Sequence, residues 1–302
     1  MRRLFIATIF LSIVLTGSSS FASLSKKQAK KLISRMAGVQ LSSDAVRIRR
    51  VSETGDQAEA TAEIETAFRF QQDSRGRWHL SEVRLGQDQW EEIALMFGAK
   101  TRDLREQRCV AAFETLSSGS SNLSVKTARC LIAGLLGVEL PSDAVRIRDV
   151  SSMGLPFSSA PSSLATALIL VDVRFRKDEG RWRAAEIRTG NGAWTSVESV
   201  VGVLNDEKRK RAQEELATLA RALENFRKDR GFYVISDKHP VLVDHLSPRY
   251  LAQVIRLDPW HRPYMYEGDR DHFSLRSSGP DGKENTGDDI VVSGPSRRPS
   301  GL

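Results

Sequence analysis

The segment Ser-Asp-Ala-Val-Arg-Ile-Arg at residues 43–49 returns unchanged at residues 142–148. Further along the chain, the Gly-Arg-Trp at residues 76–78 returns at residues 180–182. Self-similarity at a nearly fixed spacing is the sequence signature of a repeated structural unit. We therefore predict two copies of one module of about 80 residues.

Each copy is predicted to fold as a helix, three strands and a second helix (α-β-β-β-α). Ser25 in the first copy and Ser124 in the second can cap a helix whose apolar residues recur every three or four positions. Alternation of apolar and polar residues then predicts the strands. In the first copy the strands are predicted at residues 46–49, 61–70 and 78–83, and the closing helix at residues 88–97. In the second copy, residues 153–163 are predicted to form a mobile loop.

The repeated Trp78 and Trp182 begin the third strand of each copy. A large aromatic side chain kept at one strand position in both copies is typical of a core residue, so we predict that both rings are buried. The alternative is a pair of exposed platforms on which a ligand stacks.

Two rows of arginine side chains are predicted on the face opposite these cores. Arg47 and Arg49, like Arg146 and Arg148, alternate with Val and Ile along a strand. Such rows can bind an anionic polymer through bidentate contacts. An arginine row on an antiparallel sheet can equally be the solvated face, paired with glutamates.

The N-terminus predicts export. Arg2 and Arg3 precede an apolar run from Leu4 to Leu15, and small residues lead to a cut after Ala22. This pattern is typical of a signal peptide at residues 1–22, with an uncleaved anchor as the alternative. The run is too short to span a bilayer, so we expect a periplasmic or extracellular protein with no transmembrane helix in the mature chain.

The sequence contains two cysteines, Cys109 and Cys130, on predicted helices either side of a Ser-rich loop. In an oxidising compartment they can form one disulfide that closes a hairpin. Two buried thiols are the alternative, and the spacing does not decide between them.

Composition excludes several classes of function. The net charge is +7, with 40% hydrophobic and 27% charged residues, values of an ordinary folded protein. The sequence has no long Lys/Arg run and no interleaving of basic with aromatic residues, so we expect no nucleic-acid partner. Metalloprotease, nucleophile-elbow and phosphate-loop motifs are missing from the sequence, so no catalytic residue is predicted.

The last third of the chain opens with a long amphipathic helix. Asn205 or Asp206 can cap it, and Gly231 is its stop signal. Near the end, residues 278–290 form an acidic, glycine-rich loop, in which Asp281, Asp288 and Asp289 supply hard oxygen donors and Gly279, Gly282 and Gly287 allow sharp turns. Such a loop suits calcium, although its spacing is not that of an EF-hand.

The order of motifs in this part resembles type II secretion system protein G, the major pseudopilin. The resemblance rests on the long helix ending at residues 230–233, Pro-Arg-Tyr-Leu at 248–251, Asp-Pro-Trp-x-x-Pro-Tyr at 258–264, and Ser-Gly-Pro-Asp-Gly-Lys-Glu at 278–284 followed by Gly-Asp-Asp-Ile at 287–290. It implies a long helix, a small antiparallel sheet and a structural calcium ion. The prepilin-type N-terminus of that family is missing here.

The resemblance implies that Asp281, Asp288 and Asp289 bind calcium through their side chains and Ser278 through its carbonyl oxygen, with a further carbonyl at Ser293. His261 stands where the family usually has glycine, and Ser278 where a leucine is common. These two departures leave the carboxylates in place but make the local turn uncertain.

We therefore predict an α+β protein: a signal peptide at 1–22, module one at 23–100, a connecting helix and Ser-rich loop at 101–122, module two at 123–204, and a pseudopilin-like domain at 205–302. The predicted function is that of an exported, non-enzymatic, calcium-binding component of type II secretion or a derived surface assembly, with proteins of that assembly as partners. The alternative is a free periplasmic or secreted module that binds anionic glycan or lipid through Arg47, Arg49, Arg146 and Arg148.

Overall fold

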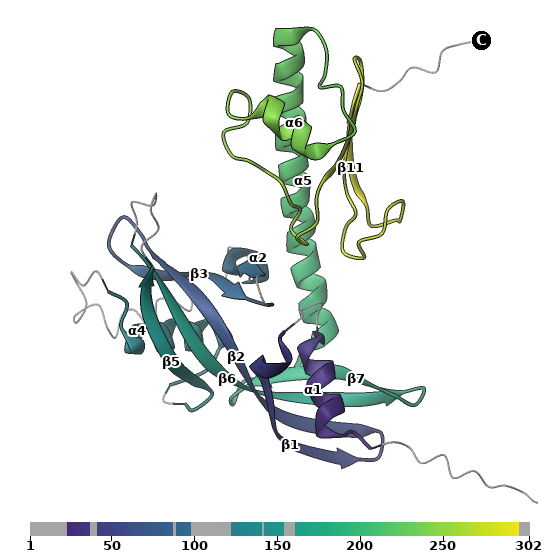
Figure 1. Cartoon of the computed structure of the whole chain (residues 1–302). Helices are drawn as coiled ribbons and strands as arrows, with labels where there is room; N and C mark the ends of the chain where they lie inside the picture. Colours follow the sequence, from purple (N-terminus) through teal and green to yellow (C-terminus); the bar gives the residue numbers. More distant parts are fainter. Residues whose placement is uncertain are drawn as a thin grey trace, which may run out of the picture.

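The computed structural model describes residues 23–36, 41–86, 89–97, 122–140, 142–153 and 161–295. Its fold is α+β. A large antiparallel sheet lies at the base, and one long helix rises from it and carries a small sheet along its upper part (Figure 1).

The large sheet has eight strands in the order β4-β3-β2-β6-β7-β8, with β1 added to β2 and β5 added to β6. The long strands β2 and β6 pair at its centre. The strands are β1 (Val46–Thr54), β2 (Gln57–Gln72), β3 (Trp78–Arg84), β4 (Trp90–Glu92), β5 (Val145–Met153), β6 (Ser162–Asp178), β7 (Arg181–Thr189) and β8 (Thr195–Ser196).

The strand register is symmetric about the centre of the sheet. Ile64 of β2 lies opposite Ile169 of β6. Val46 of β1 lies opposite the same Ile64, and Val145 of β5 lies opposite the same Ile169. The register slips just after Ile48 in β1 and just after Ile147 in β5, which are matching positions of the two halves. The half that contains β1 and β2 and the half that contains β5 and β6 are therefore related by a local two-fold axis, as the two subunits of a symmetric dimer are.

Two helices, α1 (Lys26–Ser34) and α4 (Val125–Leu136), pack against the sheet and complete its core. They begin as predicted, because the Ser25 hydroxyl accepts a hydrogen bond from the Gln28 amide and the Ser124 hydroxyl accepts one from the Thr127 amide. A short 3₁₀ helix, η2 (Ser43–Ala45), leads into β1.

Two predictions for the first half need correction. The closing helix predicted at 88–97 is the strand β4 followed by the short helix α2 (Ile93–Phe97), since Trp90 to Glu92 add to the edge of β3 instead of coiling. Of the two tryptophans, Trp182 is buried with 4% of its surface exposed, whereas Trp78 is only partly buried against the core.

The long helix α5 (Val197–Arg230) is one continuous element. Its predicted start at Asn205 or Asp206 is wrong, because the Ser196 hydroxyl caps the helix and the helix continues through Gly202 with no proline before position 205. Its predicted end is confirmed at Gly231, which has the left-handed φ of 82°. The apolar stripe is buried as expected at Ala212, Leu216, Leu219, Leu223 and Phe226.

The C-terminal sheet has the order β11-β10-β9 and packs on α5. Its strands are β9 (Met265–Gly268), β10 (Phe273–Ser277) and β11 (Ile290–Gly294), and α6 (His239–Leu246) lies beside them. This is the small antiparallel sheet expected after a long helix.

Several predicted features lie outside the described residues: the signal peptide at 1–22, Cys109, Asp88 at the start of the closing helix, the connecting segment 101–121, and most of the loop at 153–163. Cys130 is disulfide-bonded, and the described part of the chain contains no free cysteine. This favours the disulfide over two buried thiols. No helix within the described ranges is both long enough and apolar enough to cross a bilayer.

Candidate metal site in the C-terminal loop

The acidic loop joins β10 to β11, and its three aspartates meet around one hydroxyl group. Thr286 Oγ1 lies 2.6 Å from Asp288 Oδ1, 3.4 Å from Asp281 Oδ1 and 3.5 Å from Asp289 Oδ1. The structure therefore brings together the three carboxylates that the sequence singled out. Carboxylate oxygens gathered in this way are the donors that Ca²⁺ prefers.

The loop depends on two of its three glycines. Gly279 and Gly282 have φ values of 59° and 68°, in the left-handed region. A Cβ atom at Gly279 would lie 2.3 Å from the carbonyl oxygen of Asp288, and one at Gly282 would lie 2.4 Å from the guanidinium carbon of Arg262. Gly287 has open space and no such constraint, so its predicted role in the turn is not needed.

Ser278 is buried, with 7% of its surface exposed. Its carbonyl oxygen, the predicted ligand, accepts a hydrogen bond from the Gly282 amide at 3.2 Å. Ser293 lies in β11 opposite Ser274 of β10. The structure thus places Ser278 in the turn of the loop and Ser293 in the strand that follows it.

The loop itself carries more acidic than basic residues, with Asp281, Glu284, Asp288 and Asp289 against Lys283, while Arg209 and Arg262 lie beside it. The Thr286 hydroxyl and then the Asp281 amide donate to Asp288, and this holds the pKa of the Asp288 carboxyl below its usual value. Arg276 is the cation near Asp289, with a nitrogen–oxygen distance of 3.8 Å. In the part of the chain that the structure describes, no three His, Cys, Asp or Glu side chains already form a metal-binding geometry. The carboxylates instead surround the Thr286 hydroxyl.

The buried carboxylate of Asp258 holds the start of the acidic loop in place. Asp258 has 3% of its surface exposed. Its Oδ1 atom accepts from the amides of Trp260 and Arg262 at 3.0 Å and 2.9 Å, and its Oδ2 atom accepts from the Ser277 hydroxyl at 2.6 Å. Asp258 therefore joins the turn at 258–262 to the end of β10, where the acidic loop begins.

Arg262 extends this support to the loop itself. Its guanidinium donates to the carbonyl oxygens of Gly279 at 2.5 Å and Pro280 at 3.2 Å. Arg262 was not among the predicted site residues. Its place inside the Asp-Pro-Trp-x-x-Pro-Tyr segment is a sequence signal, but the contact with Gly279 spans 17 residues and is visible only in the fold.

A second polar cluster ties the C-terminal domain to the large sheet. Glu91 of β4 lies 2.8 Å from Lys208 Nζ of α5 and 3.1 Å from Nε2 of His261. Glu91 and Lys208 are buried, with 3% and 6% of their surfaces exposed. His261 adopts the left-handed φ of 65°, so the turn that its presence made uncertain does form. Sequence patterns gave no indication of this cluster.

The predicted arginine rows are largely paired with acidic residues. Glu63, which is 6% exposed, binds Arg49 of the first half at 2.5 Å and also Arg146 of the second half. Its hydrogen bond with Arg49 lowers the pKa of the Glu63 carboxyl. Arg148 pairs with Glu65 at 3.5 Å, and Arg47 is exposed on β1. This arrangement favours the solvated, glutamate-paired face over a polymer-binding row.

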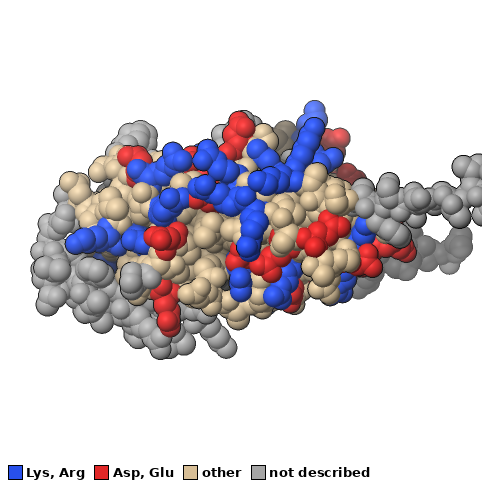
Figure 2. Space-filling model, turned by 90° about the horizontal axis from the view of Figure 1, so that it is seen from below, with Lys and Arg blue, Asp and Glu red and all other residues tan. Residues whose placement is uncertain are grey.

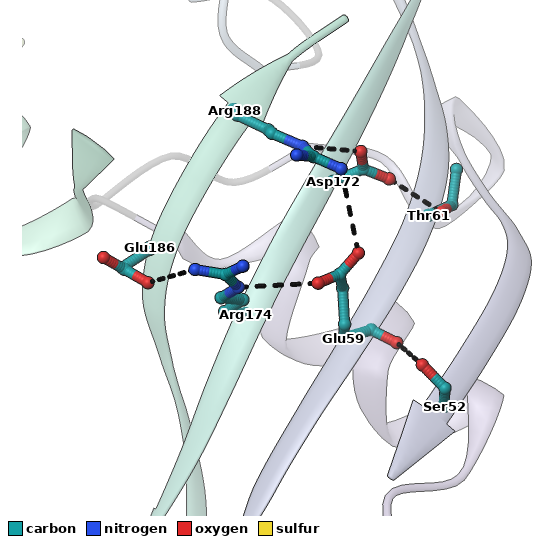
Figure 3. Close-up of polar contacts among 7 residues, drawn as sticks. All are labelled: Ser52, Glu59, Thr61, Asp172, Arg174, Glu186 and Arg188. Carbon is teal, nitrogen blue, oxygen red and sulfur yellow. Dashed lines mark hydrogen bonds and ion pairs between the residues drawn. The ribbon is translucent and has the colours of Figure 1, made fainter. Parts of the chain in front are cut away.

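Ion pairs between arginine and acidic side chains continue on β6 and β7 (Figure 3). Arg174 reaches Glu59 at 3.4 Å and Glu186 at 3.2 Å, and Arg188 reaches Asp172 at 3.0 Å. Both arginines also lie over the ring of Trp194, at 3.9 Å and 4.4 Å from its centroid. Their charges are therefore already compensated within the sheet.

A long helix followed by a small antiparallel sheet and an acidic loop is consistent with a pseudopilin domain. Residues 199–293 match the family described as type II secretion system (T2SS), protein G. The match runs from the first turn of α5 into β11 and covers about a third of the chain. The similarity to protein G therefore concerns the C-terminal domain alone. No curated protein and no solved structure matches the chain.

Proposed function

We propose that this protein is an exported, non-enzymatic component of type II secretion or of a surface assembly derived from it. The match of residues 199–293 to protein G of that system carries the proposal. Support also comes from the fold, in which this segment builds its own core around α5. Its partners would be proteins of the secretion assembly in the cell envelope.

The acidic loop is proposed to bind one calcium ion. The ion would be held by the carboxylates of Asp281, Asp288 and Asp289, which already gather around the Thr286 hydroxyl. The carbonyl oxygen of Ser278 would complete the site once it gives up its hydrogen bond from the Gly282 amide. The ion would neutralise the excess negative charge and order the loop. Its role would be structural.

The N-terminal part is proposed to have arisen by duplication of one module. Support comes from the matching registers of β1 on β2 and of β5 on β6, with the slip at the same position in each. With this double module attached to its pseudopilin-like domain, the protein would act as an accessory of the assembly.

The alternative, a free module that binds anionic glycan or lipid through its arginine rows, has less support. Arg49, Arg146 and Arg148 are each paired with a glutamate of β2. An anionic polymer would have to displace these partners before it could bind.

Site-specific photo-crosslinking in the source cells tests the proposal. A photoreactive residue replaces Leu257, an apolar residue of the C-terminal domain that is 50% exposed. The matched control replaces Val125 of α4, which is 55% exposed. We expect crosslinks to type II secretion proteins from position 257 and not from 125. The same crosslinks from both positions, or none to secretion proteins from position 257, would contradict the proposal.

A further inference from the structure

Helix α1 carries an unusual concentration of positive charge. Its nine residues include Lys26, Lys27, Lys30 and Lys31 and no acidic residue. Lys26, Lys27 and Lys31 are exposed, and Lys30 is half-buried. Within the described ranges none of the four forms an ion pair, although the Lys26 ammonium group donates to the carbonyl oxygen of Arg49 at 3.3 Å. We call these four side chains the lysine face.

The stability of the helix does not explain the lysine face. Lys26 and Lys27 lie in the first turn, where the helix dipole disfavours cations. Lys26 with Lys30 and Lys27 with Lys31 are like charges four residues apart, which repel one another on a helix surface. Local energetics would favour other residues at Lys26 and Lys27, whereas Lys31 lies in the last turn, where the helix dipole favours a cation.

The second half of the sheet provides an internal comparison. Helix α4 occupies the same place before β5 that α1 occupies before β1. Its basic residues are Lys126 and Arg129, and the Arg129 guanidinium donates to the carbonyl oxygen of Ser142. The lysine face is therefore not a requirement of the fold.

The exposed surface of α1 offers no apolar stripe that could insert into the hydrocarbon interior of a membrane. Ala29 and Ile33, on the opposite side of α1, are fully buried against the sheet. The helix lies on the lower part of the molecule beside β1 and β7 (Figure 1). Figure 2 views the molecule from below and shows Lys and Arg side chains gathered in a band, with Asp and Glu side chains among and beside them. Glu53, a nearby acid on β1, accepts a hydrogen bond from the Leu24 amide at 2.7 Å.

We propose that the lysine face of α1 binds the surface of a bilayer rich in anionic phospholipid. Lysines are point charges on flexible stems, which suit a fluid layer of headgroups better than the fixed geometry of one bound ligand. The face follows the apolar run at residues 4–15 closely in sequence, so export delivers it to a membrane surface. This inference goes beyond the proposed function and rests on one part of it, the export of the chain.

Sedimentation with vesicles tests the proposal on the full chain. One vesicle preparation contains equal parts of phosphatidylglycerol and phosphatidylcholine, and the other is pure phosphatidylcholine. The neutral vesicles report apolar binding by residues 4–15, and Arg2 and Arg3 are present in every variant, so the comparison between variants isolates the lysine face. The test variant is K26Q/K27Q/K30Q/K31Q, and the matched control K126Q/K228Q/R230Q/K238Q removes the same charge from exposed positions outside α1.

We expect the test variant to lose at least about tenfold in partitioning onto the anionic vesicles, since each lysine near such a surface contributes to binding. The control should lose less than about threefold, and K26R/K27R/K30R/K31R should bind like the parent. Parental binding should fall sharply between about 0.1 M and 1 M NaCl. Equal losses in the test and control variants would overturn the proposal. So would equal parental binding to the two vesicle types, or tighter lysine-dependent binding to soluble polyphosphate than to vesicles at equal phosphate concentration.

Discussion

Single buried polar residues decide how the acidic loop is held. Asp258 satisfies three donors from two segments, and each donor loses its partner if the carboxylate is removed. We expect Asp258→Ala to lower the free energy of unfolding by about 3 kcal/mol or more, because each stranded donor costs roughly 1–3 kcal/mol. Urea unfolding measures the change. Ser277→Ala, which removes one of the three donors, should cost much less, and equal losses would contradict this role of Asp258.

His239 at the start of α6 provides a pH-dependent signal. It is 6% exposed, and burial lowers the pKa of its imidazole below the ordinary value. The folded protein therefore keeps His239 neutral, while the unfolded chain takes up a proton at an ordinary pKa of about 6.5. Stability should fall as the pH drops below that value.

NMR titration of the His239 ring and unfolding at several pH values check this expectation. His239→Leu should flatten the pH dependence in that window, whereas His245→Leu, on the exposed side of the same helix, should keep the contribution of His239. A His239 ring that titrates at or above its ordinary value would contradict the assignment.

At the scale of elements, sequence periodicity predicted α1, α4, the body of α5 and the first three strands of each half, but not α6, β4 or β8. The caps at Ser25, Ser124 and Gly231 and the apolar stripe of α5 followed from local chemistry. Errors arose where neighbouring elements decide the outcome. Residues 90–92 form a strand because β3 offers them an edge, and α5 begins early because β8 ends at a serine that caps it.

The third strands β3 and β7 show how the two halves differ in packing. Trp182 is buried, and its replacement by Ala should lower the free energy of unfolding by about 3 to 5 kcal/mol. Trp78, at the matching position, is only partly buried, so Trp78→Ala should cost clearly less, about 1 to 3 kcal/mol. Urea unfolding of both variants tests this difference, and equal losses would contradict it.

At the scale of the whole molecule, the cluster of Glu91, Lys208 and His261 joins the large sheet to the C-terminal domain. Trp260 reinforces it through a hydrogen bond from its indole nitrogen to Asn205 at 3.0 Å. The contacts of Glu91 with His261 and of Arg262 with Gly279 join residues far apart in sequence, so spacing alone did not predict them. The aspartates of the loop were predictable because they lie within nine residues of one another.

Removing one partner of the buried ion pair should be worse than removing both. Glu91→Leu leaves Lys208 buried without its closest carboxylate and should cost about 3 to 5 kcal/mol. The double variant E91L/K208M should be closer in stability to the parent, because no buried charge remains unpaired. Unfolding curves of the single and double variants measure this coupling. Strictly additive losses would show that the pair is not coupled.

The central claim is that the C-terminal domain of this chain is a calcium-binding, protein G-like domain. Calorimetric melting of the full chain in chelator and in millimolar calcium tests it most directly. The claim predicts a higher melting temperature in calcium, with about 2.7 kcal/mol of added stability when free calcium exceeds the dissociation constant a hundredfold. Magnesium should substitute poorly because it demands tighter octahedral geometry. D288N/D289N should lose the calcium effect, while D237N, an exposed acid outside the loop, should keep it. The same melting temperature in chelator and in calcium would contradict the claim.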